Sequence, residues 1–114
     1  MEIEVSEQGP VAVLVIHGSV DSLNAEQLNA AFATQLQAGH TRLVADFSDV
    51  SYTSSAGLRA LLGNVKESRR LGGDLRIAAV QPAVERVLSL SGFTSIIKMY
   101  PDTAAAVTSF GAAA

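Results

Sequence analysis

The sequence contains no cysteine, which excludes disulfide bonds, cysteine-ligated zinc, iron–sulfur clusters and thiol catalysis. Basic residues are also few, with 8 lysines and arginines against 11 acidic residues and a formal net charge of -3 at pH 7. Arg69 and Arg70 form the one basic pair, and this charge balance argues against a nucleic-acid partner. The two histidines, His17 and His40, share no metal-like spacing with each other or with a carboxylate cluster, so we predict no bound metal.

Long apolar runs and targeting signals are missing as well. The longest purely apolar run, Val11 to Ile16, is far shorter than the roughly 20 residues that a membrane span requires. The first residues, Met1 to Glu4, include acids where a signal peptide carries positive charge. We therefore expect a cytoplasmic protein without membrane insertion. A chain of 114 residues suits one domain, predicted at 1–110, with 111–114 as a frayed tail that lacks large apolar side chains.

Strand-like and helix-like segments alternate along the chain. Apolar and β-branched residues predict strands at 3–5, 11–16, 43–47, 75–80 and 96–99. Apolar residues at three- and four-residue spacing predict a helix after each strand except the first. The first helix is expected to begin near Asn24 and to stop at Gly39, and the second to end at Gly72. The third has Pro82 in its first turn, and the fourth runs from 102 to 110.

The order of these elements predicts an α/β fold. Strands separated by single helices imply right-handed crossovers and parallel pairing. The first two strands are too close in sequence for a crossover, so they should form an antiparallel hairpin. We therefore predict a single small domain with a mixed β-sheet, an N-terminal antiparallel hairpin, otherwise mostly parallel strands, and about four helices.

Five hydroxyl side chains stand in a row, from Ser51 to Ser55, between a predicted strand and the second helix. This segment, together with 18–22 and 81–82, leaves the carboxyl ends of strands, the edge where open α/β sheets place ligands. Serines at a helix start usually act as caps, because they accept hydrogen bonds from free backbone N–H groups. A helix N-terminus also stabilises an anion, so a phosphoryl ester on a serine there is the second interpretation.

Signatures of an enzyme are missing around these serines. A nucleophile elbow needs Gly-x-Ser-x-Gly, and residues 53–57 lack the first glycine. A phosphate-binding loop needs several glycines and a lysine, and Gly57 stands alone. The phenylalanines lie where core contacts are wanted, so we predict no cofactor and no enzyme activity. Tyr52 is either an exposed hot spot for a protein partner or a cover over the sheet edge.

These residues resemble the STAS-domain family, and within it the bacterial anti-sigma factor antagonists. The resemblance runs from Met1 to about Phe110. It is carried by the segments GSVDSLNA at 18–25, DFSDVSYTSSAGL at 46–58, RRLGGDL at 69–75, PAVERVL at 82–88 and LSGF at 90–93. Each segment is short, but their order and spacing together are specific.

The resemblance implies a phosphorylation-controlled switch. In such antagonists, the unphosphorylated protein binds an anti-sigma factor that is also a serine kinase, and so frees the sigma factor. The kinase then phosphorylates one serine at the start of the second helix, and a serine phosphatase resets the cycle. The acceptor position falls on Ser55, with Ser54 as second choice. Ser54 stands where the family usually has aspartate, and Ala56 replaces a second hydroxyl.

The expected partner surface combines two loops with the first turns of the second helix, and Asp21 matches the family's acidic residue near the acceptor. The residues expected to contact the partner are Asp21, Ser22, Tyr52, Thr53, Ser54, Ser55, Ala56, Gly57 and Arg59. One domain with a hydrophilic outer face also fits a monomer when free. The alternative is a constitutive STAS interaction module, a scaffold or transport-complex subunit without a phosphoswitch, in which Ser54 and Ser55 are only caps.

Overall fold

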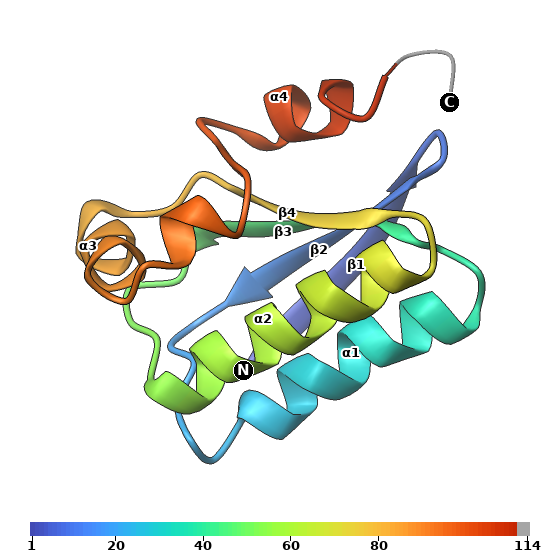
Figure 1. Cartoon of the computed structure of the whole chain (residues 1–114). Coiled ribbons are helices and arrows are strands. Elements are labelled where there is room, and N and C mark those ends of the chain that lie inside the picture. Colours follow the sequence, from blue (N-terminus) through green and yellow to red (C-terminus); the bar gives the residue numbers. More distant parts are fainter. Residues whose placement is uncertain (112–114) are drawn as a thin grey trace.

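The computed structural model describes residues 1–111, so the predicted tail at 111–114 lies almost entirely outside the described residues. A five-stranded sheet in the order β1-β2-β3-β4-β5 forms the centre of the fold (Figure 1). The strands are β1 (Glu2–Gln8), β2 (Val11–His17), β3 (Arg42–Asp49), β4 (Asp74–Ala78) and β5 (Met99–Tyr100). The helices are α1 (Ala25–Gln37), α2 (Ser55–Arg70), α3 (Pro82–Leu90), the single 3-10 turn η1 (Phe93–Ser95) and α4 (Thr103–Thr108). Among the described residues, none of these helices has the length and hydropathy of a membrane span.

The strand pairing confirms the predicted mixed sheet. β1 pairs with β2 antiparallel, while β2, β3, β4 and β5 pair in parallel with their neighbours. The hairpin turn between β1 and β2 contains Gly9, whose φ of 61° lies in the left-handed region that glycine tolerates. The α/β class and the four α-helices are therefore as the sequence pattern predicts.

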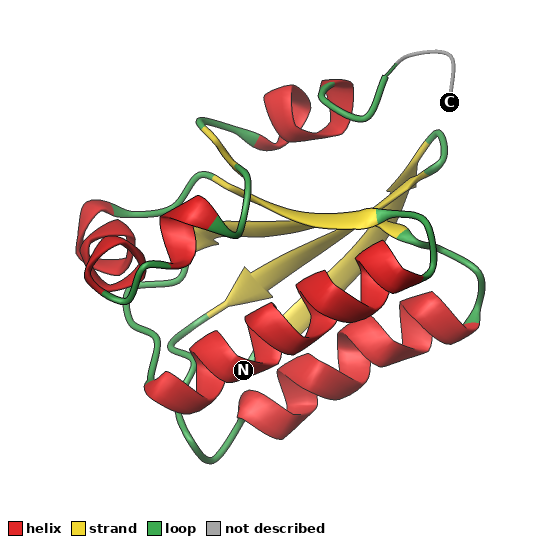
Figure 2. Ribbon diagram, in the orientation of Figure 1, coloured by secondary structure: helices red, strands yellow, loops and turns green. Residues whose placement is uncertain are grey.

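The main core lies between the sheet and the two long helices. Figure 2 shows α1 and α2 running together along one side of the sheet, and the short α4 on the other side. Alternate residues of β2 and β3, such as Ile16 and Phe47, are fully buried against Phe32 of α1 and Leu61 of α2. Full burial of each such side chain stabilises the fold by about 1.5–3 kcal/mol.

The opposite face of the same strands packs under α4. Val13 of β2 and Val44 of β3 are buried there in a second cluster that includes Ala106 of α4. Both faces of the central strands are covered, and this explains why β2 reads as an uninterrupted apolar run. The carboxyl ends of β2 and β3 are thereby held in a rigid frame that places the loops after them.

The two outer strands, β1 and β5, differ most from their predicted bounds, while the predicted bounds of β2, β3 and β4 are within two residues of the structure. The last strand was expected at 96–99, but pairing with β4 is confined to Met99 and Tyr100. The chain before them forms η1, after Gly92 ends α3 at φ 77°, and Ile97 then turns into the core at 2% exposure. β1 is longer than the predicted 3–5, because pairing with all seven residues of β2 outweighs its polar composition.

Candidate functional site

Two loops leave the carboxyl ends of β2 and β3 and meet at one end of the molecule (Figure 1). Val20 of the first loop forms a parallel bridge with Thr53 of the second. The N–H of Val20 donates to the carbonyl of Tyr52 (2.9 Å), and the N–H of Ser54 donates to the carbonyl of Val20 (2.8 Å). These bonds join the loops, so residues 18–24 and 50–54 form one surface.

The structure assigns different environments to the two serines at the start of α2. Ser54 is the N-cap: its backbone is extended, and its Oγ accepts a hydrogen bond from the N–H of Gly57 (3.3 Å). Ser55 is the first residue of the helix and is exposed. Among residues 1–111, the Ser55 hydroxyl has no hydrogen-bond partner. The capping interpretation therefore applies to Ser54, while the hydroxyl of Ser55 is free for chemistry or contact.

Two of the residues expected to contact a partner are buried. Thr53 is 3% exposed, and Gly57 lies directly beneath it. A Cβ on Gly57 would lie 2.4 Å from the Thr53 Oγ1 and 2.6 Å from the Val20 Cγ1, so only glycine fits there. Thr53 and Gly57 shape the loop and hold it against α2, and they offer no exposed contact surface.

The Asp21 carboxylate is engaged in building its own loop. Its Oδ1 accepts hydrogen bonds from the N–H groups of Leu23 (2.9 Å) and Asn24 (3.0 Å). Asn24 reciprocates, because its Oδ1 accepts from the N–H of Asp21 (2.8 Å) and its Nδ2 donates to the carbonyl of Ser19 (2.9 Å). The family resemblance implied that Asp21 is the acidic residue near the expected acceptor; the structure adds that Asp21 forms the turn before α1.

A groove lies between the first turns of α1 and α2, close to Ser55. Its volume is about 370 Å³, and its lining includes Ser22, Ala25, Glu26, Ala56, Arg59 and Ala60. Ser22, Ala56 and Arg59, three of the expected contact residues, thus border one groove. Within residues 1–111, neither Glu26 nor Arg59 forms an ion pair. Tyr52 stands 53% exposed in the neighbouring loop.

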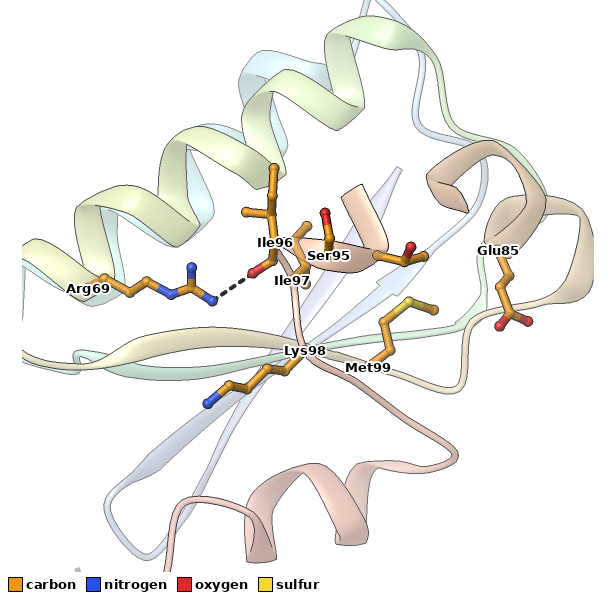
Figure 3. Close-up of a pocket in the computed structure, with 8 residues that line it drawn as sticks. Arg69, Glu85, Ser95, Ile96, Ile97, Lys98 and Met99 are labelled. Carbon is orange, nitrogen blue, oxygen red and sulfur yellow. Dashed lines mark hydrogen bonds between the residues drawn. The ribbon is translucent and has the colours of Figure 1, made fainter. Parts of the chain in front are cut away.

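A larger cavity lies elsewhere, between α3, η1 and the end of α2. It has a volume of about 620 Å³, and Arg69, Glu85 and Lys98 are its charged lining residues. Figure 3 shows the Lys98 amine on the other side of the strand ribbons from the Arg69 guanidinium, and Glu85 at the opposite end of the cavity. The guanidinium donates to the carbonyl of Ile96 (2.7 Å). The charged groups do not converge, so this cavity offers no cradle for a compact charged ligand.

His17 links three strands at the same end of the sheet as the serine loop. Its Nδ1 donates to the Asp49 carboxylate (2.7 Å), and its Nε2 donates to the Glu4 carboxylate (3.0 Å). The hydrogen bonds to Glu4 and then to Asp49 raise the pKa of His17 from 6.5 to about 9. The sequence pattern did not find this cluster, because a register shift after Val15 brings His17 opposite Asp49.

We expect the free energy of unfolding to fall between pH 7 and about pH 10 through loss of this cluster. The folded-state pKa of about 9 lies above the ordinary 6.5, so the stabilisation is complete below 6.5 and is lost as pH rises through 9. Urea midpoints measured across this range should fall less steeply in His17→Gln than in the wild type. An unchanged slope in His17→Gln would contradict this assignment.

The family of the chain is shown by comparison with known proteins. The family model described as STAS domain matches residues 2–106. The chain therefore belongs to the STAS family, as the sequence motifs indicated. A curated relative, the candidate anti-sigma factor antagonist BtrV of Bordetella bronchiseptica, is 36% identical over 110 residues, which are 96% of this chain and 95% of the relative.

Solved structures of this family share the fold. A candidate anti-sigma factor antagonist from Thermotoga maritima matches with a TM-score of 0.90 at 24% identity, over 95% of this chain and 93% of its own. The unphosphorylated anti-sigma factor antagonist SpoIIAA matches with a TM-score of 0.73 at 19% identity, over 95% of this chain and 96% of its own. Bacillus SpoIIAA in its phosphorylated form matches with a TM-score of 0.74 at 21% identity, over 95% and 98%. At these identities, the likeness establishes the fold alone.

Proposed function

We propose that this protein is an anti-sigma factor antagonist. It binds an anti-sigma factor that is also a serine kinase and thereby releases the sigma factor, and phosphorylation of Ser55 ends the binding. The observation that carries this proposal is the exposed, unbonded Ser55 at the first position of α2, in a chain that aligns with BtrV along nearly its whole length. The protein is then a substrate and a switch, and it performs no catalysis itself.

The position of Ser55 suits a phosphoryl group physically. The start of a helix presents free N–H groups and the positive end of the helix dipole, so it favours a negative group. Phosphorylation would add a charge of about -1.5 to -2. The same charge would weaken binding of a partner whose surface is complementary to the neutral serine. SpoIIAA keeps this fold in both its phosphorylated and unphosphorylated forms, which supports a switch that acts by surface charge.

Ser54 is the weaker acceptor in this proposal. Its Oγ accepts from the N–H of Gly57, so a phosphoryl ester there would disturb the cap of α2. The Ser55 hydroxyl makes no capping hydrogen bond within residues 1–111. The same proposal includes a serine phosphatase that removes the phosphoryl group from Ser55. It also takes the free protein to be a cytoplasmic monomer.

Phosphorylation is tested by intact-mass measurement after incubation with ATP and lysate from the source cells. We expect one added phosphoryl group in the wild type and in Ser54→Ala, and none in Ser55→Ala. If the added phosphoryl group is absent only in Ser54→Ala, the acceptor is Ser54. If the lysate phosphorylates a known antagonist but leaves this protein unmodified, the protein is a constitutive STAS interaction module.

Release of the sigma factor requires a second assay. Each anti-sigma factor of the source genome that contains a kinase domain is purified and bound to its sigma factor. The unphosphorylated protein should displace the sigma factor from one of these complexes, whereas the phosphorylated protein should not. Displacement from none of them would overturn the proposed function.

A further inference from the structure

Leu23 is the most exposed large apolar side chain among residues 1–111. It is 92% exposed, although leucine gains stability from burial. A single exposed apolar residue on a protein surface is ordinary and needs no explanation by itself. The loop that carries Leu23 supplies the second observation.

Side-chain hydrogen bonds constrain the backbone of this loop on both sides of Leu23. The N–H of Leu23 is held by the carboxylate of Asp21, and its neighbour Asn24 is bonded in both directions. These side-chain hydrogen bonds hold the backbone on both sides of Leu23 while its side chain stays in solvent. An exposed apolar side chain on a constrained backbone is already arranged for binding, because little entropy remains to be lost on association.

The Leu23 loop is continuous with the proposed partner surface. Val20, in the same loop, is hydrogen-bonded to Tyr52 and Ser54 through the backbone, so the two loops are joined. Ser22, the residue before Leu23, lines the groove that also contains Ala56 and Arg59 beside Ser55. A protein that covers Ser55 and this groove would therefore meet Leu23 at the edge of the same contact.

We propose that Leu23 is the apolar anchor with which this protein docks on its partner. The occupant is the anti-sigma factor of the proposed function, which must offer an apolar pocket for the leucine side chain beside the surface that covers Ser55. This inference rests on the proposed function and goes beyond it, because it assigns binding energy to a residue outside the phosphorylation motif. Binding energy in protein interfaces concentrates in a few such anchors that fill pockets.

The anchor is tested by calorimetric titration of the purified anti-sigma factor, with the wild-type protein as the parent and without ATP, so that phosphorylation cannot intervene. Leu23→Ala should weaken binding about 30-fold, as expected for a hot-spot residue. Leu23→Met, which conserves volume, should remain within about 3-fold of the parent. Thermal unfolding should be unchanged in both variants, because the side chain makes no core contact.

Leu90 of α3 provides the matched control. It is 82% exposed and lies outside the two loops, so Leu90→Ala should bind like the parent. Parental affinity in Leu23→Ala would overturn the anchor while leaving the proposed function intact. Equal losses in Leu23→Ala and Leu90→Ala would also overturn it, because they would indicate unspecific apolar contact. Absence of binding by the parent to every candidate anti-sigma factor would overturn the proposed function and the anchor together.

Discussion

Ser55→Asp is expected to weaken binding of the anti-sigma factor about 100-fold, whereas Ser55→Ala is expected to bind like the wild type. In the proposed complex, the aspartate would place a negative charge at the centre of the docked face, opposite a partner surface that complements an uncharged hydroxyl. Its fold should be intact, because an acidic side chain in the first turn of a helix stabilises that helix by about 0.3–1 kcal/mol. The measurement is a calorimetric titration of each variant with the purified anti-sigma factor.

The control for this charge change is Ser6→Asp. Ser6 is an exposed serine of β1 that pairs with Val13, toward the amino end of β2 and away from the serine loop. Ser6→Asp adds the same charge away from the serine loop, so this variant should retain wild-type affinity. Equal affinity of Ser55→Asp and the wild type would rule out a switch based on charge at this position.

Asp74→Ala is expected to lower the free energy of unfolding by about 3 kcal/mol. Asp74 is 5% exposed and accepts hydrogen bonds from the Arg69 Nε (2.8 Å), the Arg76 Nε (3.0 Å) and the N–H of Leu75 (3.0 Å). Its loss would leave the Arg76 guanidinium, whose side chain is 12% exposed, without a counter-charge. Urea denaturation followed by circular dichroism measures the change.

Asp74 connects distant parts of the fold through Arg69 and Arg76, which is why we expect a large loss of stability in Asp74→Ala. Arg69 also donates to the carbonyl of Ile96, and Arg76 donates to the Ser109 Oγ (2.7 Å) and lies 4.0 Å from the centre of the Phe110 ring. Glu67→Ala is the matched control, because Glu67 pairs with Arg70 on the exposed side of α2. Exposed pairs contribute little, so this change should cost about 0.5 kcal/mol or less. Similar losses in both variants would show that burial of Asp74 adds nothing.

The regular elements were predictable because their patterns are local. β2 reads as a continuous apolar run, and α1 and α2 show apolar residues at helical spacing with polar residues between them. β5 was not predictable in its bounds, because only Met99 and Tyr100 reach β4 after the chain has turned through η1. Where a returning chain meets a sheet edge depends on packing of distant segments, which no local pattern contains.

The candidate site divides in the same way. The row of hydroxyls before α2 and the STAS motifs are local, so the sequence alone was sufficient to predict a candidate site at the start of this helix, with Ser55 and Ser54 as its candidate acceptors. The resemblance ranked Ser55 ahead of Ser54, and only the structure could add that the Ser54 Oγ accepts a hydrogen bond from the N–H of Gly57. Burial of Thr53 likewise arises from contact with Val20 of another loop.

The sequence by itself determined the α/β class and the family, because both follow from residue types and spacing along the chain, and it selected the segment in which we propose the acceptor. Tertiary structure alone decided which of these side chains are exposed and which are buried or paired. It buries Thr53, commits Asp21 to its turn, leaves Leu23 in solvent and brings His17 against Asp49. The physical reason is that exposure and pairing depend on strand register and on contacts between loops that lie about 30 residues apart, and these are set only when the whole sheet has formed.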